Sequence, residues 1–336
     1  MTGEVLDFRA ALLGWYGESA RDLPWRRTRD AYVVWVSEMM LQQTRVAAAV
    51  EYFERFLKAF PTMEALAAAE EDAVLAQWSG LGYYRRARMM HRAAQLVVAE
   101  RGGRMPETSA ELRELPGIGE YTAAAVASIS FGEAVPVVDG NVERVLLRMY
   151  GPGLLEASGK AGAKILRETA GTLLDGQRPG DFNQAMMELG AMVCTPKGPV
   201  CMVCPVRAHC RTQGEHGTGP AKPMRSRSVG YVLMVKGRDA KVEVLLRQRG
   251  DEESQMPGMW ELPGAPEGLP DAAVLMTVRH AITNTNYSVT VFGLDAAKRR
   301  MVKGDAKRMR WVQARALEGF ALTGLARKVL KRAKIL

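Results

Sequence analysis

The feature that most constrains this chain is the placement of its cysteines. All 4 cysteines of the 336-residue chain fall in one short stretch, at Cys194, Cys201, Cys204 and Cys210. Their spacing is C-x6-C-x2-C-x5-C, and four thiolates this close together can bind one iron–sulfur cluster. Structural zinc is the alternative, although zinc sites usually show two short Cys-x2-Cys pairs and this chain has one. We therefore expect residues 194–210 to form a loop around a metal group, and the spacing favours the iron–sulfur cluster.

Hydrophobic periodicity divides the chain into two parts of different secondary structure. Before residue 215 the apolar residues recur at helical spacing, with no strand-like alternation. After residue 228 the alternation typical of strands appears, and a helix closes the chain. The predicted helices are 4–17, 31–44, 46–58, 70–77, 84–101, 119–131, 141–150, 161–175, 181–192 and 322–334, and the predicted strands are 231–235, 242–247 and 286–292.

The boundary between the two parts is a stretch of unusual composition. Residues 214–228, GEHGTGPAKPMRSRS, are rich in Gly, Pro and basic residues and have no large aliphatic or aromatic side chain. Such a composition is typical of a linker. The sequence thus predicts a multi-domain protein: an all-α domain at 1–213, a linker at 214–228 and an α+β domain at 229–336.

A glycine-rich turn and a later carboxylate stand out in the helical part. Gly117, Ile118 and Gly119 follow a proline and precede a run of small residues that is typical of a close-packed helix. A turn that opens a helix exposes backbone N–H groups, which can bind a phosphate. Asp139 follows twenty residues after Gly119, and it is either the N-cap of the next helix or a catalytic carboxylate.

A second carboxylic acid lies on the apolar face of a predicted helix. Within VVWVSEMMLQQT, Glu38 has Val34, Trp35 and Leu41 as neighbours at helical spacing. A glutamate in mid-helix usually faces solvent, but burial on this face would raise its pKa and keep it protonated near neutral pH. Cleavage of an N-glycosidic bond needs such an acid for the leaving base and a second, ionised carboxylate for the sugar cation. Glu38 and Asp139 could divide these roles.

Net charge and segment lengths bound the class of protein. The formal net charge is +9, and residues 295–336 carry 13 Lys or Arg against 3 acidic residues, or +10. A basic C-terminal end suggests contact with a polyanion, although a solvated lysine-rich helix has the same composition. We find no apolar segment long enough to span a bilayer and no secretory signal. We expect a cytoplasmic protein associated with the nucleoid, in which the cysteines stay reduced.

Several motifs together carry a resemblance to a known family. WVSEMMLQQT, GLGYYRRAR, LPGIGEYTA, VVDGNVERVL, FNQAMMELGAMVCT and the cysteine loop resemble the adenine DNA glycosylases of the helix-hairpin-helix (endonuclease III) superfamily, over residues 4–215. The resemblance implies excision of adenine mispaired with 8-oxoguanine or guanine in duplex DNA, by a protein that acts as a monomer. It also implies one 4Fe–4S cluster on the four cysteines.

The resemblance assigns roles to individual residues. Glu38 would protonate adenine and Asp139 would stabilise the sugar cation, with Tyr121 and Asn141 positioning the pair. The hairpin residues Gly117, Ile118 and Gly119 would hold DNA phosphate. Trp25, Arg26, Leu41 and Gln184 match positions that line the adenine pocket, and Gln42, Gln43 and Tyr83 match residues that insert into the stack around the opposite base. Lyase relatives have a lysine where this chain has Tyr121, which implies a monofunctional glycosylase.

The second domain resembles the Nudix-like domain of the same family. Met259–Gly264, MWELPG, matches the segment before a Nudix box, but the clustered glutamates that would hold magnesium are missing. The domain is therefore expected to read 8-oxoguanine without hydrolysing a nucleotide. The family's Phe-Ser-His loop aligns with Ile282-Thr283-Asn284, so Thr283 and Asn284 are the candidate lesion contacts.

Three other functions remain open on sequence alone. A mismatch-specific thymine glycosylase shares the scaffold, and an endonuclease III-type lyase is disfavoured by Tyr121. A catalytically silent DNA-binding iron–sulfur protein is disfavoured by the presence of both Glu38 and Asp139.

Overall fold

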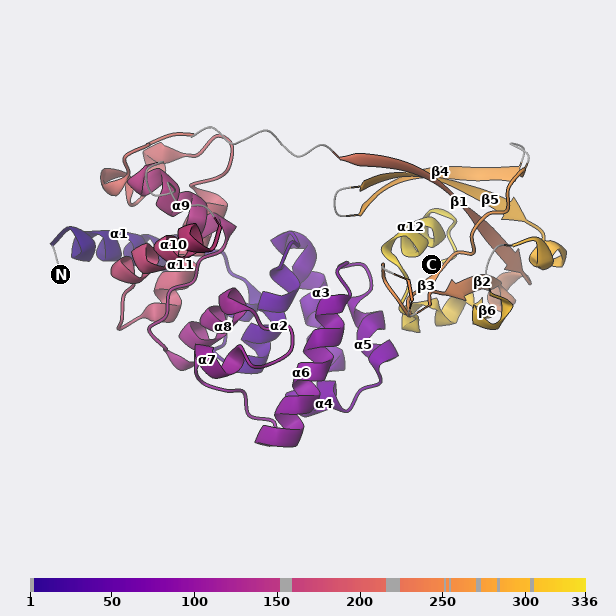
Figure 1. The fold of residues 1–336 in the computed structure, drawn as a ribbon, viewed down its shortest axis with the longest axis horizontal. Helices are drawn as coiled ribbons and strands as arrows, with labels where there is room; N and C mark the ends of the chain where they lie inside the picture. The colour runs from indigo at the N-terminus through magenta and orange to yellow at the C-terminus, as the bar shows by residue number, and fades with distance from the viewer. Residues whose placement is uncertain are drawn as a thin grey trace. The chain divides into compact units, whose positions relative to one another are not determined.

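The computed structural model describes residues 3–151, 159–215, 224–250, 252–253, 255–269, 273–282, 285–302 and 305–336 (Figure 1). The chain forms two compact units, and each unit is built from three separate segments of the chain. Unit 1 comprises residues 1–57, 62–67 and 92–219, and unit 2 comprises residues 58–61, 68–91 and 220–336. The second unit thus includes a helical stretch, residues 68–91, that lies far in the sequence from residues 220–336 of the same unit.

The described residues up to 215 are helical, as the sequence predicts. The helices are α1 (Gly3–Ser19), α2 (Ala31–Leu41), α3 (Val46–Ala59), α4 (Met63–Ala67), α5 (Glu71–Trp78), α6 (Arg85–Arg101), α7 (Ser109–Leu112), α8 (Glu120–Val126), α9 (Gly140–Tyr150), α10 (Gly159–Leu173) and α11 (Pro179–Met192). A π-helical turn, Ala127–Phe131, follows α8 where the sequence predicted a continuous helix. Short 3₁₀ turns lie at Pro24–Arg26, Cys201–Val203 and Arg207–His209.

Two packed regions position the functional residues of unit 1. The first joins α1, α9, α10 and α11 through a core that includes Phe8, Leu146 and Phe182. The second is α2, whose residues Tyr32 to Met40 are all buried except Val33. Asp30 caps this helix by accepting a hydrogen bond from the Val33 N–H at 3.0 Å. Because α2 is apolar all round, it is an interior helix.

Unit 2 contains a mixed β-sheet covered by a helix. Its strands are β1 (Arg225–Lys236), β2 (Glu243–Gln248), β3 (Trp260–Glu261), β4 (Val274–Ile282), β5 (Thr285–Leu294) and β6 (Met309–Gln313), in the order β3-β2-β1-β5-β4 with β6 paired to β2. β1 and β5 run parallel from Arg225↔Thr285 to Met234↔Leu294, whereas β4 and β5 form an antiparallel hairpin. α12 (Gly324–Arg332) buries Leu325 and Val329 in the core that contains Val278 and Val289.

The strands differ from the prediction in the start of β1 and in three further strands. β1 begins at Arg225, inside the stretch predicted as linker, because its first residues pair with β5. β3, β4 and β6 were not predicted; β3 and β6 are short, and β4 begins with adjacent apolar residues, Val274 and Leu275, that interrupt a regular alternation. The remaining linker residues 216–223 lie outside the described residues.

The close contact of α9 and α11 depends on a glycine. A Cβ atom added at Gly190 would lie 2.6 Å from Asn141 Cβ and 2.9 Å from the Asn141 carbonyl oxygen. Both distances are far below normal contact, so a larger residue would push the two helices apart. Gly190 therefore allows the N-terminus of α9 to reach its place beside α11.

We expect Gly190→Ala to destabilise the protein by about 1–3 kcal/mol, because overpacking forces the backbone to shift. The matched control is Gly14→Ala on α1, where an added Cβ has nothing within 4 Å. This control should instead gain up to about 1 kcal/mol from its better helix propensity. Urea unfolding followed by circular dichroism measures both, and equal stabilities of the two variants would contradict the packing argument.

Candidate active site

Glu38 is a buried carboxylic acid with one direct hydrogen-bond partner. It lies in α2 and is 5% exposed, and the Tyr121 hydroxyl donates to its Oε2 at 2.6 Å. The pKa of Glu38 is raised to about 7, because burial and, to a smaller extent, the charge of Asp139 outweigh the lowering effects of the Tyr121 hydrogen bond and of Arg26. Glu38 can therefore hold a proton near neutral pH, as the sequence predicted from its apolar helical face.

Asp139 is oriented by the first turn of α9. Its Oδ1 accepts hydrogen bonds from the N–H groups of Asn141 at 2.9 Å and Val142 at 2.8 Å. Its Oδ2 accepts one from the Asn141 side-chain amide at 2.7 Å. The residue is thus an N-cap, yet it also lies close enough to Glu38 to influence that residue's titration. The capping interpretation and the catalytic one are compatible, since the cap fixes where the carboxylate points.

Tyr121 is the hydrogen-bond donor to Glu38. It is in the first turn of α8, and its hydroxyl also contacts Met187 Sδ at 3.4 Å. Burial raises the pKa of Tyr121 well above its usual value, and Glu38 and Asp139 raise it further. Its proton is therefore retained, and the hydroxyl acts as a fixed donor to Glu38.

The glycine-rich turn lies between α7 and α8, as predicted. Gly117 has a φ of +79°, a left-handed conformation that favours glycine. Ile118 is buried and Gly119 is the N-cap of α8, with its carbonyl accepting from Ala123 N at 2.9 Å. The turn therefore places Tyr121 in the first helical turn, two residues after the cap.

The residues expected to line a base pocket or to insert into the stack beside it lie in unit 1, with the exception of Tyr83. Trp25 is 7% exposed and packs edge-on against Phe53, with ring centroids 5.2 Å apart. Gln42 donates to Thr122 Oγ1 at 3.0 Å, on α8. Leu41 and Gln184 are half-buried, and Gln43 is exposed with a left-handed φ of 57°.

The remaining predicted site residues belong to the other unit. Tyr83 is 44% exposed and has a left-handed φ of 49°. Thr283 and Asn284 lie outside the described residues. The structure thus connects Glu38, Tyr121, Asp139 and Asn141, whereas the pocket residues of unit 1 and the lesion contacts of unit 2 stay predictions.

One buried ion pair of the site was missed by the sequence analysis. Glu188 of α11 has a fully buried side chain and receives hydrogen bonds from Arg21 Nε at 2.7 Å and from Arg26 Nη2 at 2.9 Å. Burial alone would raise the pKa of Glu188, but the bonds from Arg21 and Arg26 outweigh it and lower the pKa to about 2. The sequence feature that could have identified Glu188 is its position one helical turn after Gln184, a predicted pocket residue.

Arg144 of α9 was also missed, and it links the site to the cysteine loop. Its Nη2 donates to Asn141 Oδ1 at 2.9 Å and to the Gly190 carbonyl at 2.7 Å, and its Nε donates to the Cys194 carbonyl at 2.8 Å. Because Asn141 in turn holds Asp139, hydrogen bonds run without interruption from the loop to the carboxylate.

The four cysteines are half-buried, unpaired by disulfides and close to one another. The pKa of the Cys204 thiol is raised to about 11, mainly by burial and also by the neighbouring Cys194, Cys210 and Cys201, against a lowering backbone hydrogen bond at Val206. Arg148 Nη1 lies 3.3 Å from Cys194 Sγ, and Gln213 N lies 3.4 Å from Cys210 Sγ. Within the described ranges, no three ligand side chains lie close enough to hold a single metal ion.

Comparison with known proteins agrees with this geometry. Residues 36–168 match the HhH-GPD superfamily of base excision DNA repair proteins. The chain is similar to this superfamily over these residues. It is 50% identical over 219 residues to the adenine DNA glycosylase of Homo sapiens, covering 62% of this chain and 40% of that protein. It is 40% identical over 210 residues to the adenine DNA glycosylase of Buchnera aphidicola, covering 62% of this chain and 59% of that protein. The chain thus spans about half the length of the relatives it matches.

Solved structures share the fold of the helical part. A thermostable thymine-DNA glycosylase is 29% identical with a TM-score of 0.58, over 63% of this chain and 97% of that one. A trapped endonuclease III–DNA complex, 21% identical with a TM-score of 0.53 over the same shares, supports the fold alone. None of the described helices is both long and apolar enough to cross a membrane.

The burial of Glu38 predicts a pH-dependent stability. Its pKa is about 7 in the folded protein and 4.5 in an exposed chain. The folded state therefore binds the extra proton, so its stabilising effect is complete below about pH 4.5 and is lost as the pH rises to 7. We expect the wild type to lose on the order of 3 kcal/mol more than Glu38→Gln across this range. Urea unfolding at pH 4.5 and 7.5 measures it, and identical pH profiles would refute the raised pKa.

Proposed function

We propose that this protein is an adenine DNA glycosylase of base excision repair, which hydrolyses the N-glycosyl bond of adenine paired with 8-oxoguanine or guanine. The observation that carries the proposal is the buried Glu38, which Tyr121 contacts and whose pKa lies near 7, close to the ionisable Asp139. The relatives in Homo sapiens and Buchnera aphidicola, both adenine DNA glycosylases, support it.

In the proposed mechanism the two carboxyl groups have different tasks. Glu38 enters the reaction protonated and donates its proton to a ring nitrogen of the flipped adenine, because a purine leaves poorly as an anion. Asp139, oriented by Asn141 and Val142, stabilises the positive charge that develops on the sugar. Water then completes the hydrolysis, and the environments of the two acids keep their roles apart.

The surrounding side chains are proposed to hold the base. The adenine pocket would be lined by Trp25, Arg26, Leu41 and Gln184. Glu188 would hold Arg26 in place by accepting a hydrogen bond from its guanidinium group. Gln42, Gln43 and Tyr83 are proposed to enter the stack around the opposite base, and Gly117, Ile118 and Gly119 to hold a DNA phosphate. The left-handed φ values of Gln43 and Tyr83 support such roles, since strained backbone is concentrated at functional sites.

A 4Fe–4S cluster on Cys194, Cys201, Cys204 and Cys210 is part of the proposal. The neighbouring thiols and their hydrogen bonds from Arg148 and Gln213 fit such a group. The cluster would order the loop structurally. The loop's Cys194 carbonyl holds Arg144, so an ordered loop supports the position of Asn141.

Unit 2 is proposed to read 8-oxoguanine without nucleotide hydrolysis, with Thr283 and Asn284 as contacts. Glu261, the glutamate of the MWELPG segment, is fully engaged by arginines: Arg247 and Arg249 contact its two oxygens, each at 2.6 Å. A carboxylate held in this way is poorly placed to bind magnesium, which supports a recognition role.

Excision assays test the proposed function. Wild-type protein should release adenine from an A·8-oxoguanine duplex and leave a T·G duplex intact. Glu38→Gln and Asp139→Asn should each lower the single-turnover rate constant by about 10²- to 10⁴-fold while still binding the duplex. Release of thymine in place of adenine would favour the thymine-glycosylase function of the structural relative. Near-normal excision by Glu38→Gln would overturn the assignment.

Tyr121→Lys tests whether the enzyme is monofunctional. An amine at this position could attack the sugar and form a Schiff base, which a phenol cannot do. We expect borohydride to trap a covalent protein–DNA adduct with the variant and none with the wild type. Tyr121→Phe is the control, since it removes the hydroxyl without adding an amine. Trapping of the wild type in similar yield would show that another lysine acts.

A further inference from the structure

The turn that carries Tyr83 has an unusual backbone. The φ angle is 110° at Gly80, 74° at Gly82 and 49° at Tyr83. A left-handed φ costs glycine little, but it is uncommon for an aromatic residue and persists only where the surrounding contacts impose it. The Tyr83 side chain is 44% exposed. The contacts that hold this turn therefore decide where an exposed aromatic ring points.

Both ends of the turn are bound to one carbonyl oxygen of the C-terminal segment. Ser79 Oγ and the Tyr84 hydroxyl donate to the Leu322 carbonyl at 2.7 and 3.2 Å. All three of these residues are buried. The Tyr84 oxygen also accepts a hydrogen bond from Gly80 N at 3.2 Å, which ties the two ends of the turn together. Because a buried polar group that loses its partner is costly, the turn is held in this conformation.

Arg327 of α12 completes this arrangement. Its Nε donates to Ser79 Oγ at 3.1 Å. A guanidinium group can only donate, so the serine oxygen must accept this bond and direct its single proton elsewhere. That proton goes to the Leu322 carbonyl. Arg327 therefore orients the hydroxyl that anchors the first end of the turn.

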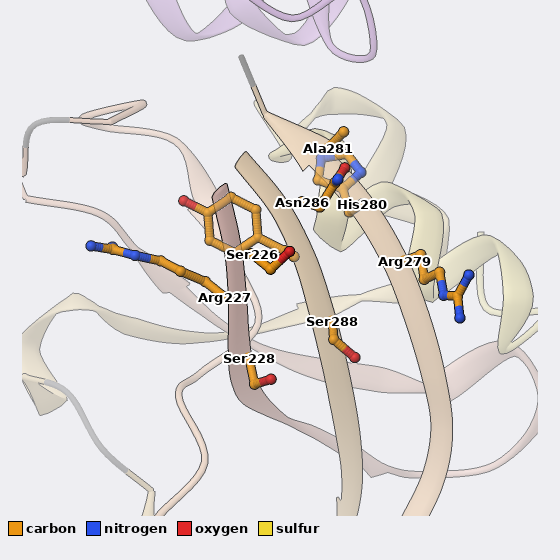
Figure 2. Close-up of a pocket in the computed structure, with 9 residues that line it drawn as sticks. Ser226, Arg227, Ser228, Arg279, His280, Ala281, Asn286 and Ser288 are labelled. Carbon is orange, nitrogen blue, oxygen red and sulfur yellow. The ribbon is translucent and has the colours of Figure 1, made fainter. Parts of the chain in front are cut away.

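The C-terminal segment that supplies these groups is itself fixed on the sheet. Trp260 N donates to the Ala321 carbonyl at 2.9 Å, and Thr323 N donates to the Trp260 carbonyl at 2.8 Å. At the start of α12, Gly324 lies against His280 of β4, which Figure 2 shows near the end of that strand. A Cβ atom added at Gly324 would lie 3.6 Å from His280 Cε1. The carbonyl and the arginine that hold the turn are thus parts of a well-packed support.

The helical stretch holds the ring of Tyr83 from the other side. The guanidinium carbon of Arg86 lies 5.4 Å from the centre of the Tyr83 ring and 5.3 Å from that of the Trp78 ring. Burial lowers the pKa of Arg86 to about 10, so the group is still charged at pH 7 and is attracted to both ring faces. The Tyr83 ring therefore has a defined place once the ends of the turn are fixed.

We propose that Arg327, together with the Leu322 carbonyl, is a positioning residue that sets Tyr83 in advance for insertion into the duplex. The proposal rests on the proposed function, in which Tyr83 enters the stack around the opposite base. A side chain that is already held in its binding conformation loses less conformational freedom on binding. The second unit would thus contribute to excision through the turn, separately from any contact of its own with the lesion.

A double-mutant cycle tests the proposal. The full-length protein with its cluster is assayed under single-turnover conditions on an A·8-oxoguanine duplex. Arg327→Met removes the donor and keeps a long side chain, and it should lower the rate constant about 5- to 30-fold, as expected for one or two lost hydrogen bonds. In a Tyr83→Ala background the same change should lower it less than about 2-fold, because the residue that Arg327 positions is gone. Arg327→Lys keeps a donor and should recover most of the lost rate.

Lys331→Met is the matched control, because it removes one positive charge from an exposed position of the same helix. It should leave the rate constant unchanged in both backgrounds. A purely structural role of Arg327 would instead lower the rate equally with and without Tyr83, and this result would overturn the proposal. Equal rate constants for Arg327→Met and the wild type would also overturn it.

Hydrogen exchange in the protein without DNA gives a readout that does not depend on excision. The amides of Gly80 and Arg86 donate to the Tyr84 hydroxyl and to the Tyr83 carbonyl. Both should exchange faster in Arg327→Met than in the wild type or in Lys331→Met. Unchanged exchange would show that Arg327 does not hold the turn. Absence of adenine excision by the wild type would refute the proposed function, and the exchange rates would still decide whether Arg327 holds the turn.

Discussion

The site depends on the removal of one carboxylic acid from water. Glu38 sits on a helix whose other residues are almost all apolar and buried, so its charged form is disfavoured. Only one short hydrogen bond, from Tyr121, compensates it directly. If Glu38 were exposed to water, it would be ionised near neutral pH and, in the proposed mechanism, could no longer protonate a leaving base. In the proposed mechanism the packing of α2 against α8 is therefore a catalytic requirement as well as a structural one.

Asp139 and Glu188, two other carboxyl groups of the helical unit, each accept several hydrogen bonds. Asp139 is held by three N–H donors, and Glu188 by two arginines that keep it ionised despite burial. Glu38 and Glu188, two buried acids of one unit, thus have pKa values shifted in opposite directions because their partners differ. Arg144 extends this arrangement to the cysteine loop, so the position of Asp139 depends on the fold around the proposed cluster.

The second unit combines segments that are distant in sequence. Ser79 Oγ and the Tyr84 hydroxyl both donate to the Leu322 carbonyl, at 2.7 and 3.2 Å, and Arg327 Nε donates to Ser79 Oγ at 3.1 Å. These bonds hold both ends of the turn that carries Tyr83. Its strained backbone is maintained by the strands and the helix that come more than 230 residues later.

Sequence by itself determined the helical and mixed α+β parts, the pairing of Glu38 with Asp139 as candidate acids, and the clustering of the cysteines. Each of these depends on local spacing, which helical periodicity and short motifs report directly. Only the tertiary structure decided the contacts of Glu188 and Arg144 and the membership of residues 68–91 in the second unit. It also decided the parallel pairing of β1 with β5. Arg21 and Glu188 are 167 residues apart, and Ser228 meets Ser288 only through a parallel strand pairing. Contacts of this kind are set by how whole elements pack, and no local pattern specifies them.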